Sequence, residues 1–199
     1  SGKQIIYVGH KNHDEAIGAL GVAPEHMHLV ESVDDIKNIN FQDNEVALLA
    51  QTTLAMSEWE PILDKVKEDF DNLDLPRKSD LCYATTNRQK ALINISSNVD
   101  VVLVVGSSTS SNTKALVTTI KNLGKEAYRI ETLNDLEDIK LENKDVAITA
   151  GASAPEHIVN EISNFLKPKD FEYYIDTDED EYFPLPKELR SNISYLSRL

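Results

Sequence analysis

Four short segments rich in hydroxyl and amide side chains each precede a pattern typical of a helix: residues 9–15, 51–53, 107–112 and 151–153. Such groups can hydrogen-bond a phosphate, and the free backbone N–H groups of a helix N-terminus also attract anions. The same residue types serve as helix caps, so a single one of them indicates little. Four such segments favour a phosphate or diphosphate site, with donors from Thr52, Ser110, Ser111, Asn112 and Ser153. Neither GxxxxGKS/T nor GxGxxG occurs, so the predicted site is not a P-loop or a dinucleotide-binding turn.

Two side chains suited to acid–base chemistry, His13 and Glu15, lie in the first of these segments. A carboxyl group that is buried or beside a negatively charged ligand can hold a proton and donate it. In a chain with 34 Asp and Glu residues, the alternative is a solvated loop acid. His10 shares the segment, whereas the other histidines are expected to be structural or at the surface: His26, His28 and His157.

The chain contains one cysteine, Cys82, within residues 80–89, which read DLCYATTNRQ. It lies just before a helical pattern, and a helix N-terminus with Arg88 nearby favours the thiolate that a nucleophile or a metal ligand requires. The alternative is a buried structural cysteine. A single cysteine excludes an internal disulfide and any metal site that needs two thiolates from this chain.

The composition excludes several classes of protein. The 199 residues carry a net charge of −14, with 41% hydrophobic and 27% charged residues, which is typical of a folded globular protein. A pI of about 4.7 without a cluster of Lys and Arg argues against nucleic acid as a partner. The longest aliphatic run, residues 101–105, is far shorter than a membrane span, and the first ten residues show no signal-peptide pattern. We expect a cytoplasmic protein.

Short aliphatic runs alternate with helical patterns, which indicates an α/β fold with parallel sheets. The two halves resemble each other, because residues 31–36 and 131–136 correspond at a spacing of 100 and Gly9 corresponds to Gly106. We predict two repeated α/β domains with small, mainly parallel sheets flanked by helices. Trp59, on an apolar stripe, is expected in the core. The predicted strands are 5–8, 28–30, 46–49, 101–105, 127–130 and 146–149, and the predicted helices are 14–20, 57–70, 113–123 and 156–166.

The predicted organisation has four parts: a first repeat at 1–80, a linker and helix carrying Cys82 at 81–98, a second repeat at 99–168 and a tail at 169–199. Parallel sheets bind ligands where loops leave the carboxyl ends of the strands. The four polar segments are therefore expected to form the walls of one site. The acidic run of the tail, over 176–181, is expected to be a solvated loop.

Five segments together resemble the 4-hydroxy-3-methylbut-2-enyl diphosphate reductases of the LytB family. They read GHKNHDE at 9–15, QTTL at 51–54, DLCYATTNRQ at 80–89, VVGSSTSSN at 104–112 and TAGASAP at 149–155. The resemblance implies three similar α/β domains around an iron–sulfur cluster. It also implies reductive removal of a substrate hydroxyl to give isopentenyl and dimethylallyl diphosphates, the last step of the methylerythritol phosphate route to isoprenoids.

The family's site residues can be matched to positions of this chain. By resemblance, Cys82 is the third of three cysteine ligands of a 4Fe-4S cluster, and Glu15 is the acid that protonates the departing hydroxyl. His13 and Thr52 contact the substrate, and Gln51 orients this network. The diphosphate is held by Ser110, Ser111, Asn112 and Ser153. The expected partners are a small allylic diphosphate and an electron donor such as ferredoxin or flavodoxin.

Two departures from the family bear on activity. The family's typical His-Pro-Glu is His13-Asp14-Glu15 here, and only two of three expected repeats are present, without the domain that carries two further cysteines. We expect a fragment that folds but holds no cluster and is inactive by itself. Two alternatives remain: a diphosphate-binding module without redox chemistry, and a subunit completed by another polypeptide. The tail is expected to pack back across the molecule, against the absent domain or a neighbour.

Overall fold

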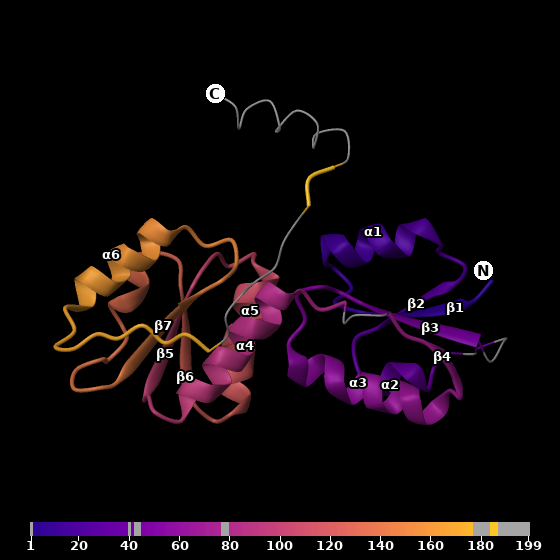
Figure 1. Cartoon of the computed structure of the whole chain (residues 1–199), viewed down its shortest axis with the longest axis horizontal. Coiled ribbons are helices and arrows are strands. Elements are labelled where there is room, and N and C mark those ends of the chain that lie inside the picture. Colours follow the sequence, from indigo (N-terminus) through magenta and orange to yellow (C-terminus); the bar gives the residue numbers. More distant parts are fainter. Residues whose placement is uncertain (1, 40, 42–44, 77–79, 177–183, 187–199) are drawn as a thin grey trace.

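A computed structural model of the chain describes residues 2–39, 41, 45–76, 80–176 and 184–186. Two small sheets, each with helices on both faces, form two lobes that lie side by side (Figure 1). Every strand pair in both sheets is parallel. The predicted α/β fold with two small parallel sheets flanked by helices is therefore confirmed. Within the described residues, no helix is both long enough and apolar enough to cross a membrane.

The first lobe is built on four strands in the order β2-β1-β3-β4. These are β1 (Gln4–Val8), β2 (Met27–Val30), β3 (Glu45–Ala50) and β4 (Asn72–Asp74). Helix α1 (Asp14–Val22) covers one face, while α2 (Val33–Ile36) and α3 (Met56–Asp69) cover the other (Figure 1). Trp59 on α3 is 7% exposed and lies in the core of this lobe, as predicted.

The second lobe is built on three strands in the order β6-β5-β7. These are β5 (Val101–Val105), β6 (Glu126–Ile130) and β7 (Val146–Ala150), with a short 3-10 helix, η1, at Leu133–Leu136. Helices α4 (Tyr83–Ser96) and α5 (Ser111–Asn122) lie toward the first lobe, and α6 (Glu156–Leu166) lies at the far side (Figure 1). All five residues of β5 are buried, as expected for a central parallel strand covered on both faces.

The two lobes repeat the same backbone connections. Gly9 N–H donates to Val30 O at 3.1 Å, and Gly106 N–H donates to Ile130 O at 2.9 Å. The residue after each neighbouring strand, Gln51 or Gly151, likewise donates to the end of the central strand at 2.8 Å. The internal repeat seen in the sequence is thus a repeat of structure.

Three short elements were not predicted: β4, α2 and η1. The last two are held by an aspartate rather than by an apolar stripe, because Asp35 and Asp135 each accept hydrogen bonds from two backbone N–H groups of the preceding turn. Helix α5 begins at Ser111, two residues before the prediction, because the Ser110 hydroxyl accepts from Thr113 N–H at 3.2 Å and caps it.

One buried side chain on α4 joins the two lobes. Gln89 is fully buried; its Oε1 accepts from Met56 N–H at 2.8 Å, and its Nε2 donates to Leu54 O at 3.0 Å. The same Oε1 accepts from the hydroxyl of Thr119 on α5 at 3.4 Å. The amide therefore fixes α4 against the first lobe and against its neighbour helix together.

Part of the predicted tail lies within the described residues. Residues 167–176 follow α6 and return over their own lobe, where Asn94 on α4 donates to Asp176 at 2.6 Å. Phe171 and Tyr173 form an edge-to-face pair with centroids 4.8 Å apart. The remainder of the acidic run, 177–181, lies outside the described residues, so its solvation stays a prediction.

We predict that Gln89→Ala destabilises the protein by about 2–3 kcal/mol, because two backbone groups lose their partner in a dry environment. Asn122→Ala is a matched control, since its exposed bond to Ser57 at 3.3 Å also links the lobes. Exposed bonds contribute little, so we expect less than about 0.5 kcal/mol there. Urea unfolding of the two variants measures the difference, and equal costs would show that Gln89 is no special link.

We also predict a pH-dependent role for Asp135. The N–H groups of Thr132 and then Glu131 hold the pKa of Asp135 below its usual 3.8. A carboxyl group whose pKa is lower in the folded than in the unfolded state stabilises the folded protein at pH values above its unfolded-state pKa. This stabilisation is lost as the pH falls through the folded-state pKa. Asp135→Ala should cost about 0.5–1 kcal/mol near pH 7. The gap between the variant and the unaltered chain should close below pH 3.8 in thermal unfolding; a gap constant with pH would contradict the assignment.

Candidate functional site

The four polar segments all follow the carboxyl ends of strands, as predicted. They leave β1, β3, β5 and β7, and in each sheet the two strands concerned are neighbours. In the first sheet β1 connects to β2 and β3 to β4, on opposite sides, which is the arrangement at which α/β proteins bind ligands. In each lobe the two polar segments therefore lie together at the carboxyl edge of the sheet.

In the first lobe, Glu15, Thr52 and Cys82 are joined by hydrogen bonds. The Glu15 carboxylate accepts from Thr52 N–H at 3.0 and 3.2 Å and from the Thr52 hydroxyl at 3.0 Å. Cys82 N–H donates to Thr52 O at 2.9 Å. Three segments that are far apart in the sequence thus meet at Thr52, which bonds the side chain of Glu15 and the backbone of Cys82.

His13 is the N-cap of α1, and its Nδ1 accepts from Glu15 N–H at 3.2 Å. A ring nitrogen that accepts carries no proton, so the imidazole proton is on Nε2. The ring is half-buried and also borders a pocket. His13 therefore presents an N–H donor to a ligand while its other nitrogen orders the helix that carries Glu15.

Two titratable groups near Glu15, the Tyr7 hydroxyl and the Asp80 carboxyl, were not identified from the sequence. Tyr7 on β1 is 3% exposed, and its hydroxyl has no hydrogen-bond partner among the described residues. Burial, followed by the charges of Glu15 and Asp80, raises the pKa of Tyr7 to about 12. Burial also raises the pKa of Asp80, whose carboxylate accepts from Ala50 N–H at 2.9 Å. Both groups depend on side-chain packing, for which periodicity gives no signal.

Gln51 supports the first loop, and its role in orienting the site stays a prediction. It is fully buried, its Oε1 accepts from His10 N–H at 3.0 Å and its Nε2 donates to the Thr53 hydroxyl at 3.1 Å. Gly9 is needed beside it, because a Cβ there would lie 2.8 Å from the Tyr7 ring and 3.1 Å from Gln51 Cβ. The loop carrying His13 is thus seated directly on Gln51.

In the second lobe, Asn112 stands out at the start of α5. It is 6% exposed, and neither its Oδ1 nor its Nδ2 has a partner among the described residues. Buried amides without partners are rare in folded proteins and call for an explanation such as a bound ligand. Ser110 and Ser111 border it, both half-buried. The structure thus brings these three residues together at the start of α5, and their role as diphosphate donors stays a prediction.

Ser153 lies in the turn after β7, next to this group. A Cβ on Gly151 would overlap the Thr113 hydroxyl and lie 3.7 Å from Ser110 Oγ, so the turn is in contact with the start of α5. Ser153 itself is exposed two residues farther on. The structure therefore places its loop at the site, and its contact with a ligand stays a prediction.

A pocket of about 430 Å³ connects the two lobes. The first loop lines it with His10, Asn12 and His13, α3 with Glu58, and the start of α5 with Thr109, Ser111, Lys114, Ala115 and Thr118. It brings together His13, predicted to contact the substrate, and Ser111, predicted to hold the diphosphate. The remaining predicted site residues lie outside its lining.

The thiol of Cys82 is half-buried at the N-cap of α4, as the sequence predicted. Arg88, expected to favour the thiolate, donates instead to Ala84 O at 2.8 Å. Among the described residues, no three His, Cys, Asp or Glu side chains gather as a metal site would require. Cys82 is the one thiol among these residues.

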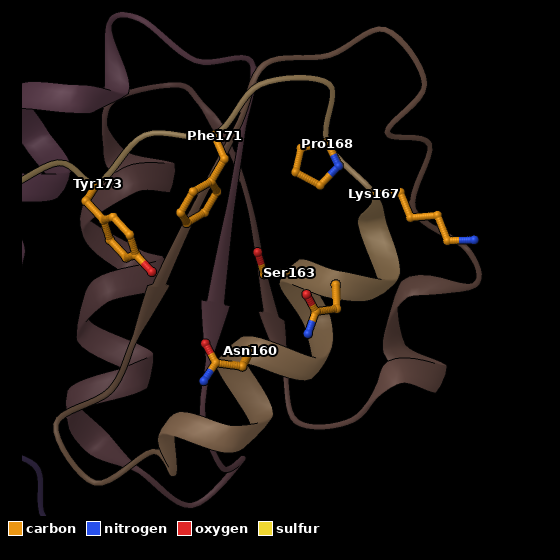
Figure 2. Close-up of a pocket in the computed structure, with 7 residues that line it drawn as sticks. Asn160, Ser163, Lys167, Pro168, Phe171 and Tyr173 are labelled. Carbon is orange, nitrogen blue, oxygen red and sulfur yellow. The ribbon is translucent and has the colours of Figure 1, made fainter.

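A second pocket, of about 350 Å³, lies on the outer side of α6 and contains none of the predicted site residues. Figure 2 shows Asn160 and Ser163 on the helix, with the rings of Phe171 and Tyr173 on the segment that follows. Among the described residues, its lining contains Lys167 but no carboxylate, imidazole or thiol, so we do not assign the chemistry to it.

The close contact between Gly151 and Thr113 leads to a prediction. Gly151→Ala should destabilise the protein by about 1–3 kcal/mol, because the new methyl group overlaps the Thr113 side chain. Gly18→Ala is the matched control: it lies within α1 with nothing near its Cβ position, and should stabilise by about 0.5–1 kcal/mol. Thr113→Ala should relieve the cost of Gly151→Ala. Chemical denaturation of the double-mutant cycle measures this, and strictly additive costs would refute the contact.

The chain is similar to a known family of proteins. The family model described as LytB protein matches residues 1–167. A 4-hydroxy-3-methylbut-2-enyl diphosphate reductase of Yersinia pestis is 37% identical over 98% of this chain and 64% of its own length. One from Rhodopirellula baltica is 39% identical over 96% and 61%.

A solved structure is also similar. The E-1-hydroxy-2-methyl-but-2-enyl-4-diphosphate reductase of Plasmodium falciparum superposes with a TM-score of 0.83 at 34% identity, over 98% of this chain and 64% of that one. The chain thus spans a little under two thirds of the length of these relatives. The chain belongs to the LytB protein family.

Proposed function

We propose that this chain is part of a 4-hydroxy-3-methylbut-2-enyl diphosphate reductase: it binds the diphosphate of the substrate, and it supplies the acid and one thiolate at the hydroxyl end. The observation that carries the proposal is the buried, unpartnered amide of Asn112 at the start of α5. The activity of its relatives, named for the reduction of this allylic diphosphate, supports the choice of ligand.

The second lobe suits the diphosphate. The Asn112 Nδ2 group and the hydroxyls of Ser110 and Ser111 are hydrogen-bond donors. The free N–H groups and the positive dipole end at the N-terminus of α5 also favour an anion there. An anion there would give the amide nitrogen the partner it lacks. We place Ser153 across the diphosphate from this group, on the neighbouring loop.

The first lobe suits the hydroxyl end. When Glu15 is protonated, it can donate that proton to the Thr52 hydroxyl, which lies 3.0 Å from Glu15 Oε2, while Thr52 passes its own proton on to the substrate oxygen. Protonation turns the departing hydroxyl into water, a better leaving group. His13 Nε2–H is placed to bind the substrate, and Gln51 holds the loop on which His13 lies.

Reduction also requires electrons, which an iron–sulfur cluster of the 4Fe-4S type would supply from a ferredoxin or a flavodoxin. We propose Cys82 as one thiolate ligand of that cluster. The other ligands must come from outside the described residues, since these contain no group of three candidate ligands. The proposal also places the protein in the cytoplasm, where a lone cysteine stays reduced.

A second candidate is a diphosphate-binding module without redox chemistry, which is favoured by the same lack of a metal-ligand group among the described residues. It shares the Asn112 site with the first candidate. It differs at the hydroxyl end, where it has no use for Glu15.

Calorimetric titration tests both ends. Asn112→Ala should weaken binding of inorganic pyrophosphate and of the hydroxylated allylic diphosphate at least about 10-fold, since each loses a hydrogen bond to a charged group. Glu15→Ala should weaken only the hydroxylated ligand, by about 5-fold. Asp14→Ala, the adjacent exposed acid, is the control and should change neither.

The outcomes separate the candidates. An Asn112→Ala variant that binds pyrophosphate as well as the unaltered chain rejects the diphosphate site. A Glu15→Ala variant with unchanged affinity for the hydroxylated ligand favours the module without redox chemistry.

A further inference from the structure

We propose that Lys114 supplies the positive charge of the anion site at the start of α5, and that it is a specificity residue for ligands with a diphosphate group. This inference rests on the proposed function and adds to it a residue that neither the sequence motifs nor the family resemblance singled out.

Lys114 lies beside Ser111, one of the proposed diphosphate donors. It follows Ser111 by three residues on α5, so the two side chains share one face of the helix. Helical side chains lean toward the N-terminus, which directs a lysine at this position toward the first turn. Both residues line the pocket of about 430 Å³ between the lobes.

Its placement in the helix is unfavourable unless an anion is near. The N-terminus of α5 carries the positive end of the helix dipole, and its first turn contains no acidic residue. By contrast, α1, α3 and α6 each place at least one acid in their first turn. A lysine one turn from this end adds its ammonium charge to the positive end of the helix dipole. A bound diphosphate would neutralise both.

Lys114 is the one lysine or arginine among the described residues that line the pocket. Among the described residues that line it, the only acid is Glu58, which already accepts from Ala55 N–H at 2.9 Å and faces His10 Nε2 at 3.3 Å. The ring of His13 is neutral while its Nδ1 accepts a hydrogen bond. Lys114 is exposed and makes no ion pair within the described part of the chain.

A local cation matters in this protein because its overall charge is −14. That charge repels an approaching diphosphate at long range. Neutral hydroxyl and amide donors hydrogen-bond the phosphate oxygens but do not balance their charge. An ammonium group beside them does, and it serves any phosphate orientation because it acts as a point charge.

The test is calorimetric titration with inorganic pyrophosphate. Lys114→Gln should weaken binding about 5- to 10-fold at about 0.1 M salt, and the difference should shrink toward none at about 1 M salt because the charge is screened. Lys114→Arg should retain the affinity of the unaltered chain. Lys121→Gln, an exposed lysine at the far end of the same helix, is the matched control and should change nothing.

Asn112→Ala, measured alongside, separates the two proposals. If it abolishes binding while Lys114→Gln behaves like Lys121→Gln, the diphosphate site stands and the role of Lys114 is rejected. If the unaltered chain does not bind pyrophosphate, both are rejected. A loss with Lys114→Gln that persists unchanged at high salt would also overturn the electrostatic role, and circular dichroism of each variant shows that it is folded.

Discussion

The geometry of the site depends on one buried amide. Gln89 bonds both Leu54 and Met56 of the first lobe while it touches Thr119 of the second, so it fixes α4 between them. Cys82 is seven residues earlier, two turns away on the same face of the helix, a rise of about 10 Å. The thiol at one end of the DLCYATTNRQ segment is therefore held in place by the glutamine at its other end. A shift of α4 would move Cys82 relative to Thr52 and α5 relative to the first loop together.

The two lobes use one backbone plan for two kinds of chemistry. His13 and Ser110 are the caps of equivalent helices, and Glu15 and Asn112 are the second residues of those helices. The same position thus holds an acid in one lobe and an amide in the other. The residue that follows β3 or β7 also differs between the lobes. The side chain of Gln51 supports the first loop, whereas Gly151 has no side chain and leaves room for Thr113. Duplication followed by exchange of side chains at matched positions accounts for the difference between the two ends of the proposed site.

The hydrophobic periodicity of the sequence and the polar residues that precede helices were enough to predict most of the strands and the loops at their ends. The buried runs gave every strand but β4, and polar residues before helices marked the four loops and the position of Cys82. It did not reveal Tyr7, Asp80 or the bridge made by Gln89. Tyr7 reads as one more apolar strand residue, and its unpartnered hydroxyl near two carboxylates exists only once β1 is packed beneath the Gly9 loop. Gln89 reads as a surface helix residue, and its burial results from the approach of the other lobe.

The division of labour between the lobes constrains how a ligand can be recognised. A molecule that reaches from the Glu15 and Thr52 pair to Asn112 must cross the boundary between the sheets, where His13 and Ser111 line one pocket. Its fit then depends on the distance between the lobes as well as on the residues of each lobe. The buried bonds of Gln89 join the two lobes, and so does the exposed bond from Asn122 to Ser57. In the proposed function, the amide that stabilises the fold therefore also helps to fix the distance that a bound ligand must span.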